Sequence, residues 1–263
     1  MKNKTALITG ASSGLGKEFA KIHASKGGNL IVVARRKDKL LQLKKELEAQ
    51  YKVKVLVITK DLTLENSVKK LYNEIKSQNI QVDYLINNTG FGGIGEFHKQ
   101  DINRNLDMIK LNILALTELT ALFLPDFVNR NHGKILNVSS TASWMPGPLQ
   151  SIYYATKAFV TSFSYAINEE VRHTKTNVTV TTLLPGPTDT EFGKISDMDK
   201  TVLFDNTATP EKVAKDGYDA MLKGKLKCVT GVNGTLKMLM KLIPFSPKRF
   251  VLKQVYKMQQ FKK

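Results

Sequence analysis

The segment TALITGASSGLG, residues 5–16, joins a short apolar run directly to a turn that contains three glycines. Thr5–Thr9 has the length and composition of a buried strand, and a helical pattern follows the turn to about Ser25. In such a strand–turn–helix unit, glycines permit a tight turn, close approach of a ligand to the backbone and close packing of the helix. The helix start offers free amides to an anion. We therefore predict a dinucleotide-binding turn, with an ordinary structural turn as the alternative, at Gly10, Ser12, Ser13, Gly14, Leu15 and Gly16.

Apolar runs and helical patterns continue to alternate along the chain. The expected strands are residues 5–9, 30–34, 53–59, 83–87, 134–139 and 177–184, with a short edge strand at 227–230. The expected helices are residues 15–25, 37–50, 65–79, 101–131 and 153–174. Apolar strands separated by helices predict a parallel sheet that is covered on both faces. The predicted fold is α/β, a single Rossmann-type doubly wound sheet of about seven strands with a basic C-terminal helical tail.

The chain has no internal repeat and no linker-like segment before residue 185, which favours one domain. We predict a catalytic or binding domain over residues 1–233, including a substrate loop at 188–226, and a basic amphipathic extension over 234–263. Within the extension, Ser246 is expected to cap a helix whose first residue is Pro247.

Composition excludes several classes of protein. The 263 residues are 42% hydrophobic, which suffices for a sizeable core, and carry a formal charge of +17. Cys228 is the only cysteine and the four histidines are scattered, so neither a disulfide scaffold nor a metal centre is expected. We see no targeting segment and no continuous apolar run near the roughly 20 residues that span a bilayer. A soluble, cytoplasmic protein is expected.

Two arginines follow the second expected strand and bear on the choice of dinucleotide. An NAD site places an acidic residue there to bind the ribose 2′-hydroxyl, whereas this chain has Arg35 and Arg36. A guanidinium forms bidentate, charge-assisted hydrogen bonds with a 2′-phosphate. NADP(H) is therefore the predicted cofactor, although solvated charges at a helix start are the alternative interpretation.

Tyr153 and Lys157 lie one helical turn apart on the same helix face. A nearby ammonium stabilises a phenolate and lowers its pKa, which would make the tyrosine a general acid or base near neutral pH. Chance produces many such pairs, so this spacing gains weight only with further motifs. The adjacent Tyr154 is expected to pack or to face a partner helix.

These motifs together resemble the short-chain dehydrogenase/reductase family. The resemblance covers about residues 3–195 and rests on the glycine turn, NNTG at 87–90, NVSS at 137–140, the Tyr-x-x-x-Lys pair and Pro185-Gly186. NNTG has Thr89 where alanine is commoner in the family. Within the family, the oxoacyl and steroid-type ketone reductases are closest. The resemblance implies a catalytic set of Asn112, Ser140, Tyr153 and Lys157, where Ser140 polarises a carbonyl, Tyr153 donates a proton, Lys157 holds the nicotinamide ribose and Asn112 anchors a water.

The resemblance also implies further cofactor contacts. Asp61 would bind the adenine amino group, and the remaining contacts would come from Asn88, Gly90, Tyr153, Lys157, Pro185, Gly186, Thr188 and Thr190. Without the resemblance, Asn112 could equally be a polar residue at a helix kink. Family members often form dimers or tetramers, so a homodimer or homotetramer is expected.

Apolar side chains in the expected loops predict a pocket for a small apolar carbonyl substrate. The candidates, which could instead be ordinary packing residues, are Phe91, Phe97, Trp144, Met145, Leu149 and Phe192.

Eleven of the 40 Lys and Arg residues, and no acidic residue, lie between Ala220 and Lys263. Val251, Val255 and Met258 share one helical face, and a second apolar segment comprises Leu236, Met238, Leu239, Met240, Leu242 and Ile243. A basic amphipathic helix can lie on an anionic membrane, so peripheral membrane contact through residues 234–263 is one hypothesis. Packing on its own domain and a subunit contact are the others. No nucleic-acid partner is expected, because the basic residues alternate with aliphatic residues rather than with stacking aromatics.

The sequence thus predicts NADPH-dependent reduction of a ketone, aldehyde or oxoacyl group, with Tyr153 as the general acid. The alternative is a catalytically silent dinucleotide-binding sensor or scaffold. The complete set of four catalytic residues argues against the alternative, because a scaffold needs none of them.

Overall fold

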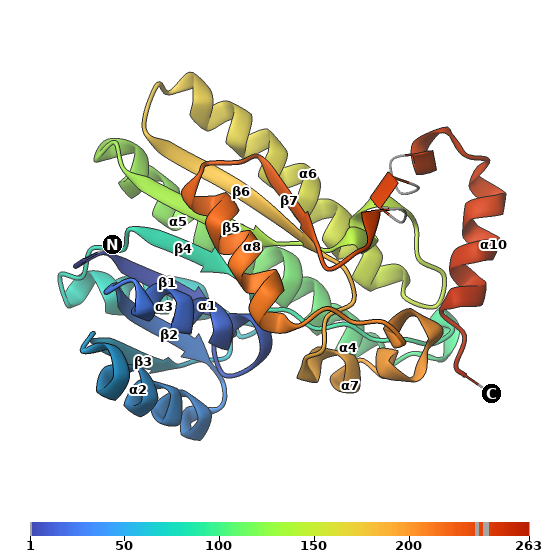
Figure 1. Ribbon diagram of the computed structural model, residues 1–263, viewed down its shortest axis with the longest axis horizontal. Helices are drawn as coiled ribbons and strands as arrows, with labels where there is room; N and C mark the ends of the chain where they lie inside the picture. Colours follow the sequence, from blue (N-terminus) through green and yellow to red (C-terminus); the bar gives the residue numbers. More distant parts are fainter. Residues whose placement is uncertain (1, 235–236, 239–241, 263) are drawn as a thin grey trace.

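Seven short strands pair side by side, all parallel, in the order β3-β2-β1-β4-β5-β6-β7 (Figure 1). The computed structural model describes residues 2–234, 237–238 and 242–262. The strands are β1 (Thr5–Thr9), β2 (Asn29–Ala34), β3 (Val55–Thr59), β4 (Tyr84–Asn87), β5 (Gly133–Val138), β6 (Val178–Pro185) and β7 (Lys227–Thr230). The predicted Rossmann-type sheet and its strand count are confirmed, and every expected strand lies within two residues of an observed one.

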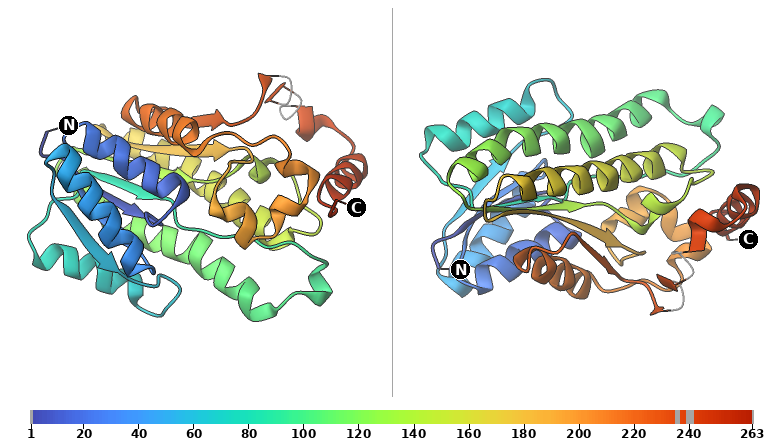
Figure 2. Two further views of the ribbon diagram at one scale, coloured as in Figure 1. Left: turned by 60° about the horizontal axis from the view of Figure 1, so that its bottom comes forward. Right: turned by 90° about the horizontal axis from the view of Figure 1, so that it is seen from above.

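Helices cover both faces of the sheet (Figure 2). One layer comprises α1 (Gly14–Ser25), α2 (Lys37–Tyr51) and α8 (Pro210–Leu222). The other layer comprises α3 (Ser67–Ser77), α5 (Leu116–Asn129) and α6 (Ser151–His173), with α4 (Ile102–Ile109) leading into α5. The short elements are η1 (Phe97–Lys99), η3 (Thr141–Trp144), α7 (Glu191–Ile195), η4 (Met198–Lys200), η5 (Val202–Phe204) and η6 (Ile243–Phe245).

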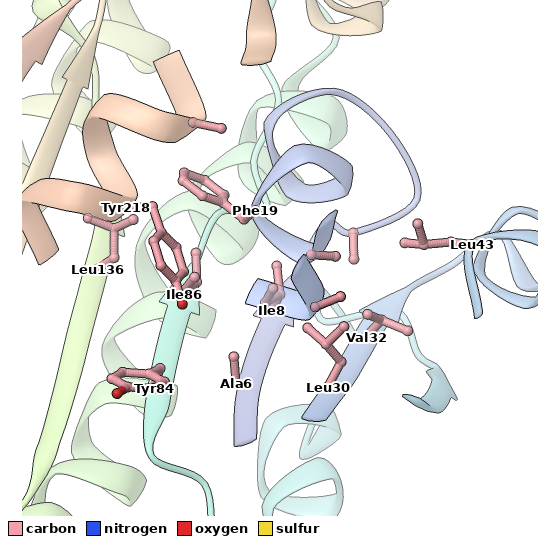
Figure 3. Close-up of a cluster of buried hydrophobic side chains, with 14 of the residues drawn as sticks. Ala6, Ile8, Phe19, Leu30, Val32, Leu43, Tyr84, Ile86, Leu136 and Tyr218 are labelled. Atoms are coloured by element: carbon pink, nitrogen blue, oxygen red, sulfur yellow. The ribbon is translucent and has the colours of Figure 1, made fainter. Parts of the chain in front are cut away.

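The core lies between the sheet and each helix layer, because successive strand side chains point to opposite faces. In β1, Ala6 and Ile8 pack toward Phe19 of α1 and Tyr218 of α8, as Figure 3 shows, while Leu7 packs on the other face. Burying both faces explains why central strands such as β1 and β2 are nearly continuous apolar runs rather than alternating ones. Each fully buried large apolar side chain contributes about 1.5 to 3 kcal/mol to the stability of this core.

The strand order reverses at β1, whose neighbours are β2 on one side and β4 on the other. The loops that follow β1 and β4 leave the sheet in different directions at its carboxyl edge. In open α/β sheets, ligands bind in the crevice at this switch point. The topology therefore places the glycine turn after β1 where a ligand site is expected.

The expected helix over residues 101–131 is interrupted. A π-helical segment, η2 (Lys110–Ala115), joins α4 to α5 and contains Asn112. By length and composition alone, the helical stretch Ile102–Asn129 is apolar enough to cross a membrane. Its apolar residues include Phe123 and Phe127, which pack against the sheet, so a core helix accounts for the same composition.

The last helix, α10 (Lys248–Met258), begins later than expected. Pro247 precedes the helix rather than occupying its first turn, and Ser246 does not cap it. Instead, the Ser246 hydroxyl donates a hydrogen bond to the carbonyl of Leu242 (3.0 Å), because the preceding turn η6 offers an acceptor. Of the second apolar segment expected before this helix, Leu236, Leu239 and Met240 lie outside the described residues.

Candidate active site

A cavity of about 1400 Å³ runs along the carboxyl edge of the sheet, from the glycine turn to the C-terminal helix α10. Among the residues predicted to bind a cofactor, all except Gly16 line it. The four predicted catalytic residues also come together here, with Asn112 directly behind the wall formed by Gly90 and Lys157. The topology thus brings residues that lie up to 180 positions apart in the sequence, such as Gly10 and Thr190, to the same cavity.

The glycine turn has the backbone shape that its sequence predicts. Gly10 and Gly14 both adopt positive φ, +69° and +50°, which L side chains rarely adopt. Gly16 has an ordinary φ, but a Cβ there would overlap the carbonyl oxygen of Gly10 and lie 2.7 Å from Asn88 Nδ2. Asn88 fixes the turn from the neighbouring strand, because its Nδ2 donates to the carbonyl of Thr9 (3.0 Å). The turn is therefore held open at the start of α1.

The two arginines after β2 occupy different positions. Arg36 is held by three groups, since its Nη2 lies 2.7 Å from Glu191 Oε2 and donates to the hydroxyls of Ser13 (2.8 Å) and Ser12 (3.1 Å). The hydrogen bond from Arg36 keeps the pKa of Glu191 below its ordinary value. The Arg35 side chain is 74% exposed, with its Nη1 3.7 Å from Asp61 Oδ2. Arg35 is therefore the less constrained of the two cations at this rim.

Ser140 and Tyr153 lie on the same cavity wall. Ser140 precedes η3, where its hydroxyl accepts a hydrogen bond from the amide of Ala142 (3.1 Å) and lies 3.4 Å from the Pro185 carbonyl. Burial raises the pKa of Tyr153 to about 12, and a hydrogen bond with Ser140 acts in the opposite direction. Tyr153 therefore keeps its proton throughout the neutral pH range.

Lys157 lies beneath Tyr153, with its Nζ 5.8 Å from the centre of the tyrosine ring. The Nζ donates to the carbonyl of Val138 (3.0 Å), and burial lowers the pKa of Lys157 to about 8. The expected depression of the Tyr153 pKa by this ammonium is not seen. At Tyr153 the loss of solvation has the largest effect and raises the pKa. The Lys157 ammonium donates to the backbone carbonyl of Val138 rather than to the Tyr153 hydroxyl.

Asn112 owes its position to the π-helical segment η2, and such segments occur frequently at functional sites. Its Oδ1 accepts from the amide of Phe91 (3.1 Å), while its Nδ2 donates to the Phe91 carbonyl (3.0 Å) and to the hydroxyl of Thr156 (3.1 Å). Asn112 therefore ties the loop after β4 to the helix that carries Tyr153. Sequence reasoning did not identify Thr156 as its partner.

The loop after β6 forms the opposite wall. The Gly186 amide donates to the carbonyl of Thr230 (2.9 Å), and the Thr188 hydroxyl donates to the carbonyl of Gly186 (2.9 Å). Thr190 packs over Gly14 and caps α7, where its hydroxyl accepts from the amide of Phe192 (3.3 Å). Among the described residues, no group of three or more His, Cys, Asp or Glu could hold a metal ion.

Comparison with known proteins agrees with this geometry. The family model for short chain dehydrogenases matches residues 4–200. The chain belongs to the short-chain dehydrogenase family. It is 35% identical over 196 residues to a very-long-chain 3-oxoacyl-CoA reductase of Macaca fascicularis, a match that covers 72% of this chain and 61% of that protein. It is 34% identical over 197 residues to a probable NADP-dependent dehydrogenase of Haemophilus influenzae, covering 74% and 76% of the two chains.

The fold of this short-chain dehydrogenase is also similar to that of a solved structure. A short-chain dehydrogenase from Sphingobium yanoikuyae, in complex with NADPH, superposes with a TM-score of 0.81 at 30% identity. The superposition covers 92% of this chain and 94% of that one. The likeness therefore extends beyond the residues that the family model matches.

Of the six residues proposed as substrate wall in this dehydrogenase, three line the cavity: Phe91, Met145 and Phe192. The other three lie outside it, which corrects the prediction. Phe97 is 57% exposed in η1, and Trp144 packs beneath the ammonium of Lys227. Leu149 adopts a φ of +68° and its carbonyl accepts from the amide of Gly95, so it shapes a loop.

Sequence reasoning missed two parts of the cavity wall. Glu191 pairs with Arg36 across the site, and nothing in its sequence context indicates that contact. The other part is α10, which contributes Phe250, Val251, Gln254, Val255 and Met258. The periodicity of α10 revealed an apolar face but gave no sign of what that face would cover. The predicted division of the chain at residue 233 remains a prediction, although α10 packs on the same cavity as the catalytic residues.

Proposed function

We propose that this short-chain dehydrogenase is an NADPH-dependent reductase of a carbonyl group on an apolar substrate. One observation carries the proposal. Ser140, Tyr153 and Lys157 line the same cavity as the glycine turn and Arg35, and the far end of that cavity is apolar. A dinucleotide bound at the turn and a carbonyl near Tyr153 would share this one cavity.

The residues present fit NADP(H). Side chains at Gly10 and Gly14 would press on Asn88 and Thr190, so glycines let the turn keep this close-packed shape, and α1 begins there with free amides that suit a pyrophosphate. Arg35 and Arg36 lie where a 2′-phosphate would need cations. Bound NADPH supplies the hydride, so the protein has to supply orientation and electrostatics. The NADPH complex of the similar Sphingobium yanoikuyae dehydrogenase supports this choice.

The chain's own groups provide the proton and position the carbonyl. Tyr153 is protonated at neutral pH because its pKa is near 12, so it acts as the general acid toward the developing alkoxide oxygen. The Ser140 hydroxyl lies on the same wall and donates a hydrogen bond to that oxygen. Lys157 lines the cavity beside Tyr153 and would hold the cofactor ribose, while Asn112 holds the loop after β4 in place.

The apolar end of the cavity favours a long-chain oxoacyl group as the substrate. Its lining includes Phe91, Met145 and Phe192 together with the inner face of α10. The name of the similar Macaca fascicularis reductase, which refers to very-long-chain 3-oxoacyl-CoA, points to the same class. The matched region spans 61% of the length of that protein.

The experiment that tests this function follows NADPH oxidation by absorbance with 3-oxoacyl thioesters of increasing chain length, simple ketones and aldehydes. We expect turnover with at least one carbonyl class, and kcat/KM rising with the length of the apolar chain. Tight NADPH binding without turnover on any of them would favour the sensor or scaffold instead.

Cofactor preference gives a separate prediction. Arg35→Asp should weaken NADPH binding by at least about 30-fold, because a charge-assisted hydrogen bond is lost and a repulsive carboxylate is gained. NADH binding should change little. Lys45→Asp makes the same charge change on the exposed face of α2, away from the cavity, and serves as the control. Fluorescence titration with both cofactors measures the preference, and an unchanged NADPH to NADH ratio in Arg35→Asp would contradict the assignment.

We also propose a homo-oligomer, a dimer or a tetramer. Apolar side chains remain exposed on the helix layer that carries the site, including Leu114 (57%) and Phe159 (38%), and a second copy would cover them. Light scattering that gave the monomer mass at working concentration would contradict this proposal.

A further inference from the structure

The C-terminal helix α10 is fixed to the catalytic unit along one face. Val255 is 2% exposed and packs in a cluster with Tyr153 and Tyr154. The residues after the helix are anchored as well, because the Lys262 amide donates to the carbonyl of Lys200 (3.0 Å) and the Lys262 ammonium pairs with Asp205. The helix therefore forms a wall of the cavity, and its opposite face is left to solvent at one end of the molecule (Figures 1 and 2).

The solvent face of α10 is strongly basic. Lys248, Arg249, Lys253 and Lys257 are all exposed, and none of them takes part in an ion pair with another described residue. No acidic residue occurs anywhere from Ala220 to Lys263, so the helix itself has no neutralising partner. The carboxylates on the adjoining loop are mostly engaged, since Asp197 pairs with Lys200 and Asp205 with Lys262. The face therefore carries uncompensated positive charge.

Large apolar side chains lie exposed next to these cations. Phe245 is 87% exposed just before α10, and Phe250 is 60% exposed within it. Other exposed apolar residues lie on the cavity rim, namely Ile195 (53%), Val202 (54%) and Leu242 (51%). Burying such side chains in a lipid interface is favourable, whereas leaving them in water is not. The apolar rim and the basic face thus adjoin each other at the mouth of the cavity.

We propose that the outer face of α10, together with Phe245, docks on an anionic lipid surface, so that the substrate cavity opens toward the membrane. The positive charge of the face favours binding to an anionic surface. The exposed aromatic rings favour a surface with an apolar interior, in which they can be buried. A nucleic acid would match the charge but would not bury Phe245 and the aliphatic rim. The orientation would let a lipid-soluble oxoacyl substrate enter without crossing water. Entry of the substrate from the membrane rests on the proposed function, whereas the docking of α10 on the membrane does not.

Co-sedimentation of the full chain with vesicles tests the docking. We expect binding to phosphatidylcholine vesicles that contain phosphatidylglycerol, weak binding to phosphatidylcholine alone, and release by salt. Each basic residue near an anionic surface contributes about 5-fold in affinity, so Arg249→Glu/Lys253→Glu/Lys257→Glu should lose at least about 100-fold. Phe245→Ser should weaken binding about 10-fold without altering any charge.

The control variant Lys45→Glu/Lys69→Glu/Lys70→Glu makes the same charge change on α2 and α3, at the far end of the molecule from α10 (Figure 1). We expect it to bind vesicles within a few-fold of the unaltered chain. An unchanged melting temperature and unchanged NADPH affinity in the α10 variant would show that the helix still packs.

The proposal would be overturned by no vesicle binding, by equal binding to both vesicle types, or by equal loss in the two triple variants. A change of oligomeric state in the α10 variant would assign the face to a second copy and would also overturn it. Vesicle binding is measured without turnover, so its failure is distinguishable from failure of the reductase function. If both hold, the α10 variant should show a raised KM for a vesicle-bound oxoacyl substrate but an unchanged KM for a short water-soluble ketone.

Discussion

Tyr153→Phe is expected to reduce turnover by about 10²- to 10⁴-fold, the usual contribution of a positioned general acid. Burial raises the pKa of Tyr153 to about 12, so at neutral pH the hydroxyl holds the proton that the alkoxide must receive. Phenylalanine keeps the ring that packs against Phe192 and Tyr154 but removes this proton. NADPH binding should therefore stay within a few-fold of the unaltered enzyme.

The matched control for Tyr153→Phe is Tyr165→Phe. Tyr165 lies on the same helix α6, and its buried hydroxyl has no hydrogen-bond partner among the described residues. The same atom is removed about three turns away, outside the cavity. We expect nearly full activity in this control, with kcat and KM measured by NADPH oxidation for both variants. Retained turnover in Tyr153→Phe, or equal losses in both, would refute the role of Tyr153 as the acid.

The fold could be predicted because its signals are local. The strands from β1 to β5 are mainly apolar runs, as in Thr5–Thr9, and each is followed by a turn and a helical pattern. The exceptions concern the ends and interruptions of helices. The π-helical segment at Asn112 replaces a regular helix, and there the Asn112 side chain bonds the loop after β4, a contact that no local pattern encodes. Likewise, Ser246 has the residue type of a helix cap but bonds the preceding turn instead.

The reacting end of the site could also be predicted, because its motifs are short and rigidly spaced. The turn at Gly10, and the pair Tyr153 and Lys157, each lie within one element, and the parallel sheet brings them to the same edge. The substrate end could not be predicted equally well. Trp144 and Leu149 are close in sequence to the catalytic residues, yet other contacts turn them away from the cavity.

The pKa values of Tyr153 and Lys157 depend on how deeply each side chain is buried, which the sequence alone does not show. The spacing of Tyr153 and Lys157 correctly places them on one wall but led to the expectation of a lowered tyrosine pKa. In the structure, the loss of solvation acts on both groups and moves their pKa values in opposite directions. The result suits a proton donor, which needs to be protonated, better than it suits a base.

Gly16→Ala is expected to damage both folding and cofactor binding. Its Cβ would overlap the carbonyl oxygen of Gly10, a backbone atom that cannot swing aside as a side chain can, and would lie 2.7 Å from Asn88 Nδ2. To relieve this overlap, α1 must move away from the turn after β1, which breaks the alignment of the helix amides with the bound pyrophosphate. We expect a loss of about 2 to 3 kcal/mol in the free energy of unfolding, as for other overpacked sites.

NADPH affinity should fall by at least about 30-fold in Gly16→Ala, because each charge-assisted hydrogen bond to a phosphate contributes about 1.5 to 3 kcal/mol. Gly234→Ala provides the control, since a Cβ at Gly234 meets no atom of the described residues within 4 Å. That change should alter stability by less than about 0.5 kcal/mol. Urea unfolding and fluorescence titration with NADPH measure the two effects. Since the overlap involves the turn itself, stability and cofactor affinity should fall together, and a Gly16→Ala protein with unchanged NADPH affinity would show that the turn does not bind the pyrophosphate.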